Sequence, residues 1–126
     1  GVDVRILVPE KSNHLIADWA ARSFYAELLE SGAQLWLYQD VMIHAKTMTV
    51  DGRWSTIGTA NIDQLSMTGN YEINLQITDR EQAAYLEKVF LEDLTNAREM
   101  SLLEWESRGA FVRMTERLVR PLRYIL

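Results

Sequence analysis

The sequence predicts an α/β domain in which a mixed β-sheet is flanked by helices on both faces. Residues 4–8 form a short apolar run, which predicts a buried strand that stops at Pro9. Apolar residues then recur at helical spacing over residues 15–28, and a second strand-like run covers residues 34–38. A strand, a helix and a strand in this order favour a right-handed crossover between two parallel strands.

The rest of the chain supplies antiparallel strands and further helices. Residues 42–50 predict a third strand, and Asp51-Gly52 is typical of a tight hairpin that returns through residues 53–57. Residues 71–78 alternate apolar and polar side chains, which predicts a half-buried strand, and the pattern turns helical after Asp79. The first helix is expected to end near Ser31-Gly32, and shorter helices are expected over residues 61–67 and 111–119.

Composition limits the classes of function. The chain has no cysteine, which excludes disulfides and thiolate chemistry, and its two histidines, His14 and His44, are too few for a histidine-rich metal site. No apolar run is long enough to cross a bilayer, and no secretory signal pattern is present. The net charge of −5 disfavours a nucleic-acid partner. We expect residues 1–126 to form a single soluble domain, and the opening of the chain inside a strand-like run suggests a fragment of a longer protein.

His44 and Lys46 are the first candidate site residues. On a strand, residues two positions apart project to the same side, so the imidazole and the ammonium would be neighbours. Such a pair makes sense if an anion lies between the two groups. A phosphodiester fits, because Lys46 would neutralise its non-bridging oxygens while neutral His44 attacks phosphorus.

The segment Gly58-Thr59-Ala60-Asn61 follows where the return strand ends. Backbone N–H groups at the start of a helix favour an anion, and the Thr59 hydroxyl and the Asn61 amide add donors. The hairpin would bring these donors back beside His44. Because Lys46 and these donors can take the place of a metal ion, the residues require no metal and no cofactor.

These residues resemble a known signature. His44-x-Lys46, four residues, Asp51, six residues and then Gly-Thr-Ala-Asn are similar to the HxKxxxxD motif of the phospholipase D superfamily, which usually continues with Gly-Ser-x-Asn. Thr59 is a departure that keeps the hydroxyl. Together with residues 1–7 and 70–75, the chain resembles the C-terminal half of bacterial cardiolipin synthases over almost its entire length.

The resemblance implies a role for each residue. His44 would form a covalent phosphohistidine intermediate, Lys46 and Asn61 would hold the phosphate, and Thr59 would stand where the family has serine. Glu72 lies where the family has an acid that hydrogen-bonds the nucleophilic histidine and so fixes its tautomer. Asp51 is either a catalytic residue or only a hairpin residue, since Asp-Gly is ordinary turn chemistry.

Three functions are compatible with this motif. The resemblance implies a phosphatidyltransferase, which moves a phosphatidyl group from phosphatidylglycerol to His44 and then to a second phosphatidylglycerol, giving cardiolipin. The same intermediate with water as acceptor would make a phospholipase D-type hydrolase or a nuclease. A non-catalytic partner or membrane-docking module is the third alternative, but it has no need for His44, Lys46, Asn61 and Glu72 together.

The reaction needs more than this chain offers. While His44 attacks phosphorus, another group must protonate the departing alkoxide. The family supplies that group from a second HxKxxxxD half, in the same parent chain or by homodimerisation, so the fragment alone is expected to be inactive. The arginine-rich residues 105–126 either contact an anionic membrane surface or form an ordinary packed helix. The resemblance places the full-length parent at the bacterial inner membrane.

Overall fold

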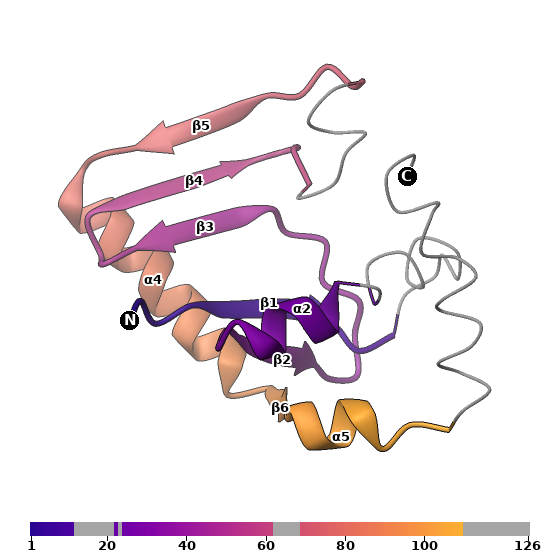
Figure 1. The fold of residues 1–126 in the computed structure, drawn as a ribbon. Coiled ribbons are helices and arrows are strands. Elements are labelled where there is room, and N and C mark those ends of the chain that lie inside the picture. The colour runs from indigo at the N-terminus through magenta and orange to yellow at the C-terminus, as the bar shows by residue number, and fades with distance from the viewer. Residues whose placement is uncertain (12–21, 23, 62–68, 110–126) are drawn as a thin grey trace. The chain divides into compact units, whose positions relative to one another are not determined.

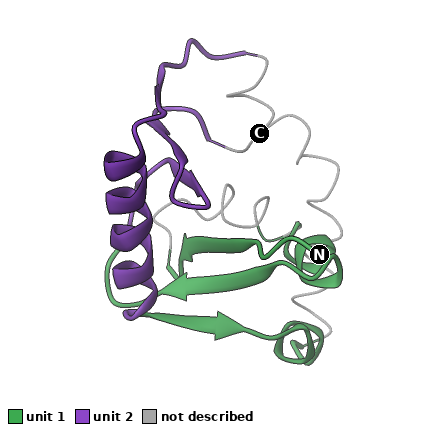
Figure 2. Cartoon of the chain, turned by 90° about the vertical axis from the view of Figure 1, so that its left-hand side faces the viewer, with its two compact units in different colours: residues 1–42, 97–126 green, residues 43–96 purple. Residues whose placement is uncertain are grey.

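The described residues fall into two compact units. A computed structural model describes residues 1–11, 22, 24–61 and 69–109 of the chain (Figure 1). The first unit comprises Gly1–Met42 and Ala97–Leu126, and the second comprises Ile43–Asn96 (Figure 2). Each unit holds one three-stranded sheet. The α/β class is therefore confirmed, with the strands divided between two sheets.

The first unit is built on a mixed sheet. Its strands are β1 (Arg5–Pro9), β2 (Gln34–Tyr38) and β6 (Ala97–Met100), in the order β1-β2-β6 (Figure 1). Strand β1 runs parallel to β2, as the strand, helix and strand order predicted, and β2 runs antiparallel to β6. Strand β6 was not predicted, because its central residues Arg98 and Glu99 are charged and exposed.

Helix α2 (Tyr25–Glu30) ends where the sequence predicts. Gly32 adopts a left-handed conformation with φ of 87°, which costs glycine little because it has no Cβ. The backbone N–H of Gly32 donates to the carbonyl of Leu29, and the N–H of Ala33 donates to the carbonyl of Leu28, at 3.1 Å each. These bonds satisfy carbonyls that the helix end would otherwise leave open. The expected start of this helix lies outside the described residues.

The core of the first unit combines aromatic and aliphatic side chains. The rings of Tyr25 and Trp105 lie 5.2 Å apart between centroids, in a tilted arrangement. Helix α5 (Leu102–Glu106) carries Trp105 and packs against α2, and the hydroxyl of its N-cap Ser101 accepts the N–H of Glu104 at 3.1 Å. The buried hydrophobic members of this core are Tyr25, Leu35, Leu37, Met100 and Trp105.

Burial of Trp105 bears on the predicted membrane contact of residues 105–126. With 6% of its surface exposed, Trp105 is a core residue and does not contribute to that contact. Residues 110–126, which include the expected helix over 111–119, lie outside the described residues. No helix of the described ranges has both the length and the apolar composition required to cross a bilayer.

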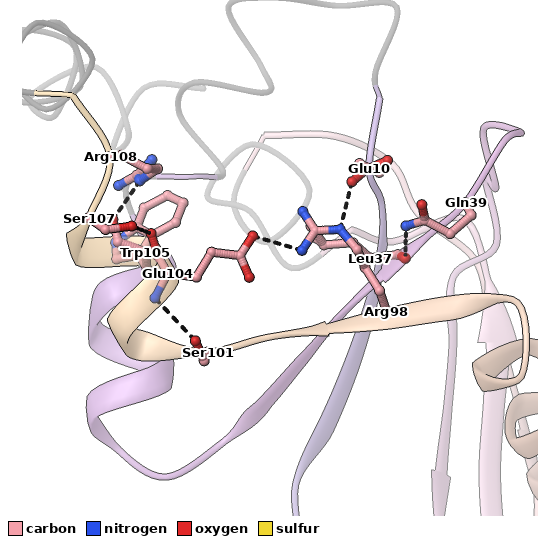
Figure 3. Close-up of polar contacts among 9 residues, drawn as sticks. All are labelled: Glu10, Leu37, Gln39, Arg98, Ser101, Glu104, Trp105, Ser107 and Arg108. Atoms are coloured by element: carbon pink, nitrogen blue, oxygen red, sulfur yellow. Dashed lines mark hydrogen bonds and ion pairs between the residues drawn. The ribbon is translucent and has the colours of Figure 1, made fainter.

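A chain of ion pairs joins three elements of the first unit (Figure 3). Arg98 of β6 donates from Nε to Glu10 at 2.8 Å and from Nη1 to Glu104 of α5 at 2.7 Å. The hydrogen bond from Arg98 lowers the pKa of Glu10, and the two carboxylates raise the pKa of Arg98. Since Glu10 directly follows β1, the network ties the end of β1 to β6 and α5.

The second unit is an antiparallel sheet covered by one long helix. Its strands are β3 (Thr47–Val50), β4 (Trp54–Gly58) and β5 (Asn74–Ile77), in the order β3-β4-β5. Strands β3 and β5 are shorter than the predicted runs 42–50 and 71–78, because β4 offers partners only between Trp54 and Gly58. Helix α4 (Arg80–Leu94) packs against β3 and β4. Asp79 caps it by accepting the N–H of Gln82 at 3.0 Å, which confirms the predicted start of this helix.

The predicted hairpin joins β3 to β4. Asp51 and Gly52 both have positive φ, 51° and 59°, and the N–H of Arg53 donates to the carbonyl of Val50 at 3.0 Å. Two successive positive φ angles are characteristic of a type I′ turn, for which Asp-Gly is well suited. Strand β4 begins one residue later than predicted, at Trp54, because Arg53 still belongs to the turn.

Candidate active site

His44 and Lys46 lie immediately before β3 rather than within it. The backbone N–H of Gly58 donates to the carbonyl of Lys46 at 3.1 Å, which extends the β3–β4 ladder by one bond and anchors Lys46. The side chains meet, with Nζ of Lys46 2.8 Å from Nε2 of His44. The two groups are thus neighbours as expected, although strand alternation is not the reason for it.

This contact favours one tautomer of His44. A lysine ammonium carries only donors, so a neutral His44 ring accepts this hydrogen bond at Nε2 when its proton lies on Nδ1. The lone pair of Nε2 therefore faces the ammonium. A phosphate placed at this point would meet a nucleophilic nitrogen and a positive charge together, and exposed His44 is accessible to it.

Three successive backbone N–H groups, from the last residue of β4 to Ala60, already have protein partners. Gly58 donates to the carbonyl of Lys46 at 3.1 Å, Thr59 to the carbonyl of Ile73 at 3.0 Å, and Ala60 to Oδ1 of Asn74 at 3.3 Å. These three backbone N–H groups therefore have acceptors within the protein, and their contact with an anion stays a prediction. The side chains of Lys46 and Asn61 are further donors in this region.

Thr59 and Glu72 form a short hydrogen bond. The Thr59 hydroxyl donates to Oε2 of Glu72 at 2.5 Å and accepts the N–H of Ile73 at 3.0 Å. The single hydroxyl proton is thus directed to the carboxylate, and the bond joins two of the predicted site residues. The phosphate contact of Thr59 and the contact of Glu72 with His44 stay predictions.

Gly58 lies where a side chain would not fit. A Cβ built there would lie 2.7 Å from Cα of Asn74, and it would overlap the Asn74 side-chain oxygen and the Ile73 carbonyl even more closely. The absence of a Cβ lets β4 approach β5 where the turn begins. Sequence reasoning missed Ile73 and Asn74 as parts of this region, since their contacts depend on the β4–β5 register.

Asp51 and Asn61 lie at opposite ends of the hairpin's return strand. Asp51 is at the tip of the hairpin, separated from Lys46 by the four residues of β3. At about 3.3 Å per residue, that strand spans roughly 13 Å, so the position of Asp51 favours its turn role. Asn61 is exposed at the end of the Gly58 turn, and the short helix expected after it lies outside the described residues from Ile62.

The first unit has a cavity of about 260 Å³ that is separate from these residues. Arg22, Arg98 and Arg108 contribute to its lining, but none of the six predicted site residues does. Arg98 is engaged by two carboxylates and the guanidinium of Arg108 lies over the Trp105 ring, so both arginines have structural partners. Among the described residues, no group of three His, Cys, Asp or Glu side chains could hold a metal ion.

Comparison with known proteins adds a family to this geometry. A family model described as the PLD-like domain of cardiolipin synthase matches residues 1–94, which include all six predicted site residues. The chain belongs to this family. No solved structure matches the chain.

Curated relatives match the PLD-like chain over nearly its whole length. It is 36% identical over 126 residues to a cardiolipin synthase of Listeria monocytogenes serotype 4a (strain HCC23) and 39% identical over 126 residues to the major cardiolipin synthase ClsA of Bacillus subtilis (strain 168). It is also 38% identical over 120 residues, or 95% of the chain, to the probable cardiolipin synthase YwiE of the same Bacillus strain. The first two alignments cover 100% of this chain and 26% of each relative, and the third covers 24% of YwiE, so the chain spans about a quarter of their length.

Proposed function

We propose that the chain is one half of a phosphatidyltransferase that makes cardiolipin from phosphatidylglycerol. The observation that carries the proposal is the contact of Lys46 Nζ with His44 Nε2 at 2.8 Å, beside the turn that presents Asn61. It unites a nucleophile and a positive charge at one point, and we assign the amide donor to Asn61. Membership of the cardiolipin synthase PLD-like family supports a phospholipid as the substrate.

In the first half-reaction, Nε2 of His44 attacks the phosphorus of phosphatidylglycerol. A P–N bond forms and the P–O bond to the glycerol head group breaks, while Lys46 and Asn61 hold the non-bridging oxygens. The departing alkoxide takes a proton from an acid that this chain does not provide. As the ring becomes positively charged, its Nδ1–H is available to a carboxylate, the role we assign to Glu72.

In the second half-reaction, the hydroxyl of another phosphatidylglycerol attacks the phosphohistidine. A new P–O bond forms, the P–N bond breaks and the hydroxyl proton returns to the group that acted as acid. The products are cardiolipin and the glycerol released earlier, and His44 is restored as a neutral base.

The missing acid points to a second half. The sequence contains one HxKxxxxD copy, and the chain spans about a quarter of the length of its curated relatives. We assign residues 1–126 to the C-terminal half of a two-motif enzyme whose other copy provides the acid. We also propose that the full-length protein works at the bacterial inner membrane, because both its substrate and its product are lipids.

Trapping of the phosphoenzyme tests the proposal. Full-length protein is mixed with phosphatidylglycerol labelled in its phosphate and is quenched, and acid-labile label on the protein is counted for wild type and His44→Asn. We expect label on wild type and a loss of at least about 100-fold in His44→Asn, because asparagine cannot form the P–N bond. The 126-residue chain alone should give no turnover. Undiminished labelling of His44→Asn, or steady turnover by the monomeric 126-residue chain, would refute the proposal.

A further inference from the structure

We propose that Asn74 is a positioning residue that holds the turn Gly58–Asn61 in its phosphate-binding arrangement. The inference rests on the proposed function, because it concerns the same phosphate. Asn74 opens β5 and is paired with Gly58 of β4. Its Oδ1 accepts the backbone N–H of Ala60 at 3.3 Å, and Ala60 directly precedes Asn61.

The turn is attached to both neighbouring segments in sequence order. The N–H of Gly58 reaches the carbonyl of Lys46, and the N–H of Thr59 reaches the carbonyl of Ile73 on the other side. Beyond Thr59 the acceptor of the next N–H is a side chain, since Asn74 Oδ1 takes the N–H of Ala60. Asn74 therefore extends the attachment of β4 by one residue, to the peptide that leads into Asn61.

Gly58 and Asn74 fit each other sterically. A Cβ at Gly58 would overlap the Asn74 side-chain oxygen, so the asparagine amide occupies the space that the glycine leaves open. With that amide in place, its oxygen reaches over Gly58 to Ala60. The pair explains why a glycine and an asparagine meet at the end of the β4–β5 ladder.

This attachment affects chemistry through Asn61. Without an acceptor at position 74, the N–H of Ala60 loses its hydrogen bond to Asn74 Oδ1. The peptide units around Ala60 then gain freedom to rotate. The Asn61 carboxamide would then shift relative to Lys46, whose backbone is fixed through Gly58. A displacement of about 1 Å in a group that positions a substrate can cost on the order of 100-fold in rate.

Two substitutions at position 74 separate positioning from packing. Asn74→Leu keeps the approximate size and removes the acceptor, whereas Asn74→Asp keeps an oxygen that can accept the Ala60 N–H. The matched control is Gln76→Ala, an exposed polar residue two positions further along the same face of β5. In the full-length protein, kcat and KM for phosphatidyl transfer, the Kd for tungstate as a phosphate analogue and Tm are measured for each variant.

We expect Asn74→Leu to lower kcat by roughly 10- to 100-fold and to weaken tungstate binding, with Gln76→Ala unchanged. Asn74→Asp should recover at least part of both losses, although its charge opposes the anion. Unchanged kcat and tungstate affinity in Asn74→Leu would overturn the inference, as would an Asp variant no better than Leu. His44→Asn tested alongside keeps the two proposals apart: transfer by that variant would remove the proposed function, whereas the tungstate measurement still tests Asn74.

Discussion

Lys46 contributes to the site through hydrogen bonding as well as charge. In the proposed reaction, its ammonium donates to Nε2 of His44, the nitrogen to which we assign the attack on phosphorus. A phosphate that enters would accept the Lys46 hydrogen bond in place of His44 and expose the Nε2 lone pair to phosphorus. The same contact that orders the ring before substrate binds can therefore be exchanged for a contact with substrate, at little cost in hydrogen bonds.

Ser55 is a buried polar residue in the described part of the second unit. It is the second residue of β4 and is fully buried, and its hydroxyl has no hydrogen-bond partner among the described residues. A buried hydroxyl without a partner costs about 1–3 kcal/mol. We expect Ser55→Ala to keep or raise the free energy of unfolding, by up to about 1 kcal/mol, as measured by urea denaturation.

The control for Ser55 is its neighbour Thr56, which points to the opposite face of β4 and is partly exposed. Thr56→Ala removes a β-branched side chain and should lower the free energy of unfolding slightly. A loss of more than about 1 kcal/mol in Ser55→Ala would show that the hydroxyl has a partner in solution.

At the scale of the element, a substitution in the turn of the β3–β4 hairpin can show whether Asp51 has a turn role or a catalytic role. Asparagine tolerates a left-handed conformation as aspartate does, so Asp51→Asn removes the charge and keeps the turn. We expect its kcat to stay within about threefold of wild type, because β3 alone spans roughly 13 Å between this turn and Lys46. Loss of activity at unchanged Tm would instead make Asp51 part of the chemistry.

Gly52→Ala in the same turn should affect stability and not activity. Gly52 has φ of 59°, and an added Cβ would lie 2.8 Å from Oε2 of Glu87 on α4. The variant should therefore lose about 1 kcal/mol of unfolding free energy, while its kcat per folded molecule is retained.

Elements that depend on local patterns were predictable from the sequence. Asp51-Gly52 specified the hairpin through its backbone preference, and Asp79 marked the start of α4 because its side chain caps the helix. Strand β6 was not predictable, since exposed Arg98 and Glu99 carry no strand signal and the strand exists through its pairing with β2.

The candidate site shows the same division. The spacing of His44 and Lys46 identified the pair, but their backbone lies outside β3 and their contact depends on local side-chain geometry. The attachment of Ala60 to Asn74 joins residues fourteen positions apart. It follows from the β4–β5 register, which alternation of apolar and polar residues alone does not specify.

At the scale of the whole molecule, the predicted site residues lie in one continuous segment, whereas the first unit is assembled from two segments. All six predicted site residues belong to Ile43–Asn96, whereas the first unit joins Gly1–Met42 to the chain that returns from Ala97 (Figure 2). The two segments of the first unit are therefore held together by the pairing of β6 with β2 and by the contacts of Arg98 with Glu10 and Glu104. These contacts can be tested without disturbing His44 or Lys46.

The pH dependence of stability gives that test. Since Arg98 lowers the pKa of folded Glu10, the ion pair stabilises the folded state above the unfolded pKa of about 4.5 and is lost as the pH falls through the lower folded value. We expect Glu10→Gln to reduce the free energy of unfolding by about 0.5–1 kcal/mol at pH 7, a small effect because the partners are partly exposed.

Urea denaturation at a series of pH values should show the free energies of unfolding of wild type and Glu10→Gln converging below pH 4.5. Glu99→Gln, a change at the exposed neighbour of Arg98 on β6, should show a smaller difference. A difference in the free energy of unfolding between wild type and Glu10→Gln that persists unchanged to pH 3 would contradict this. It would mean that the packing of Glu10, and not its charge, stabilises the first unit.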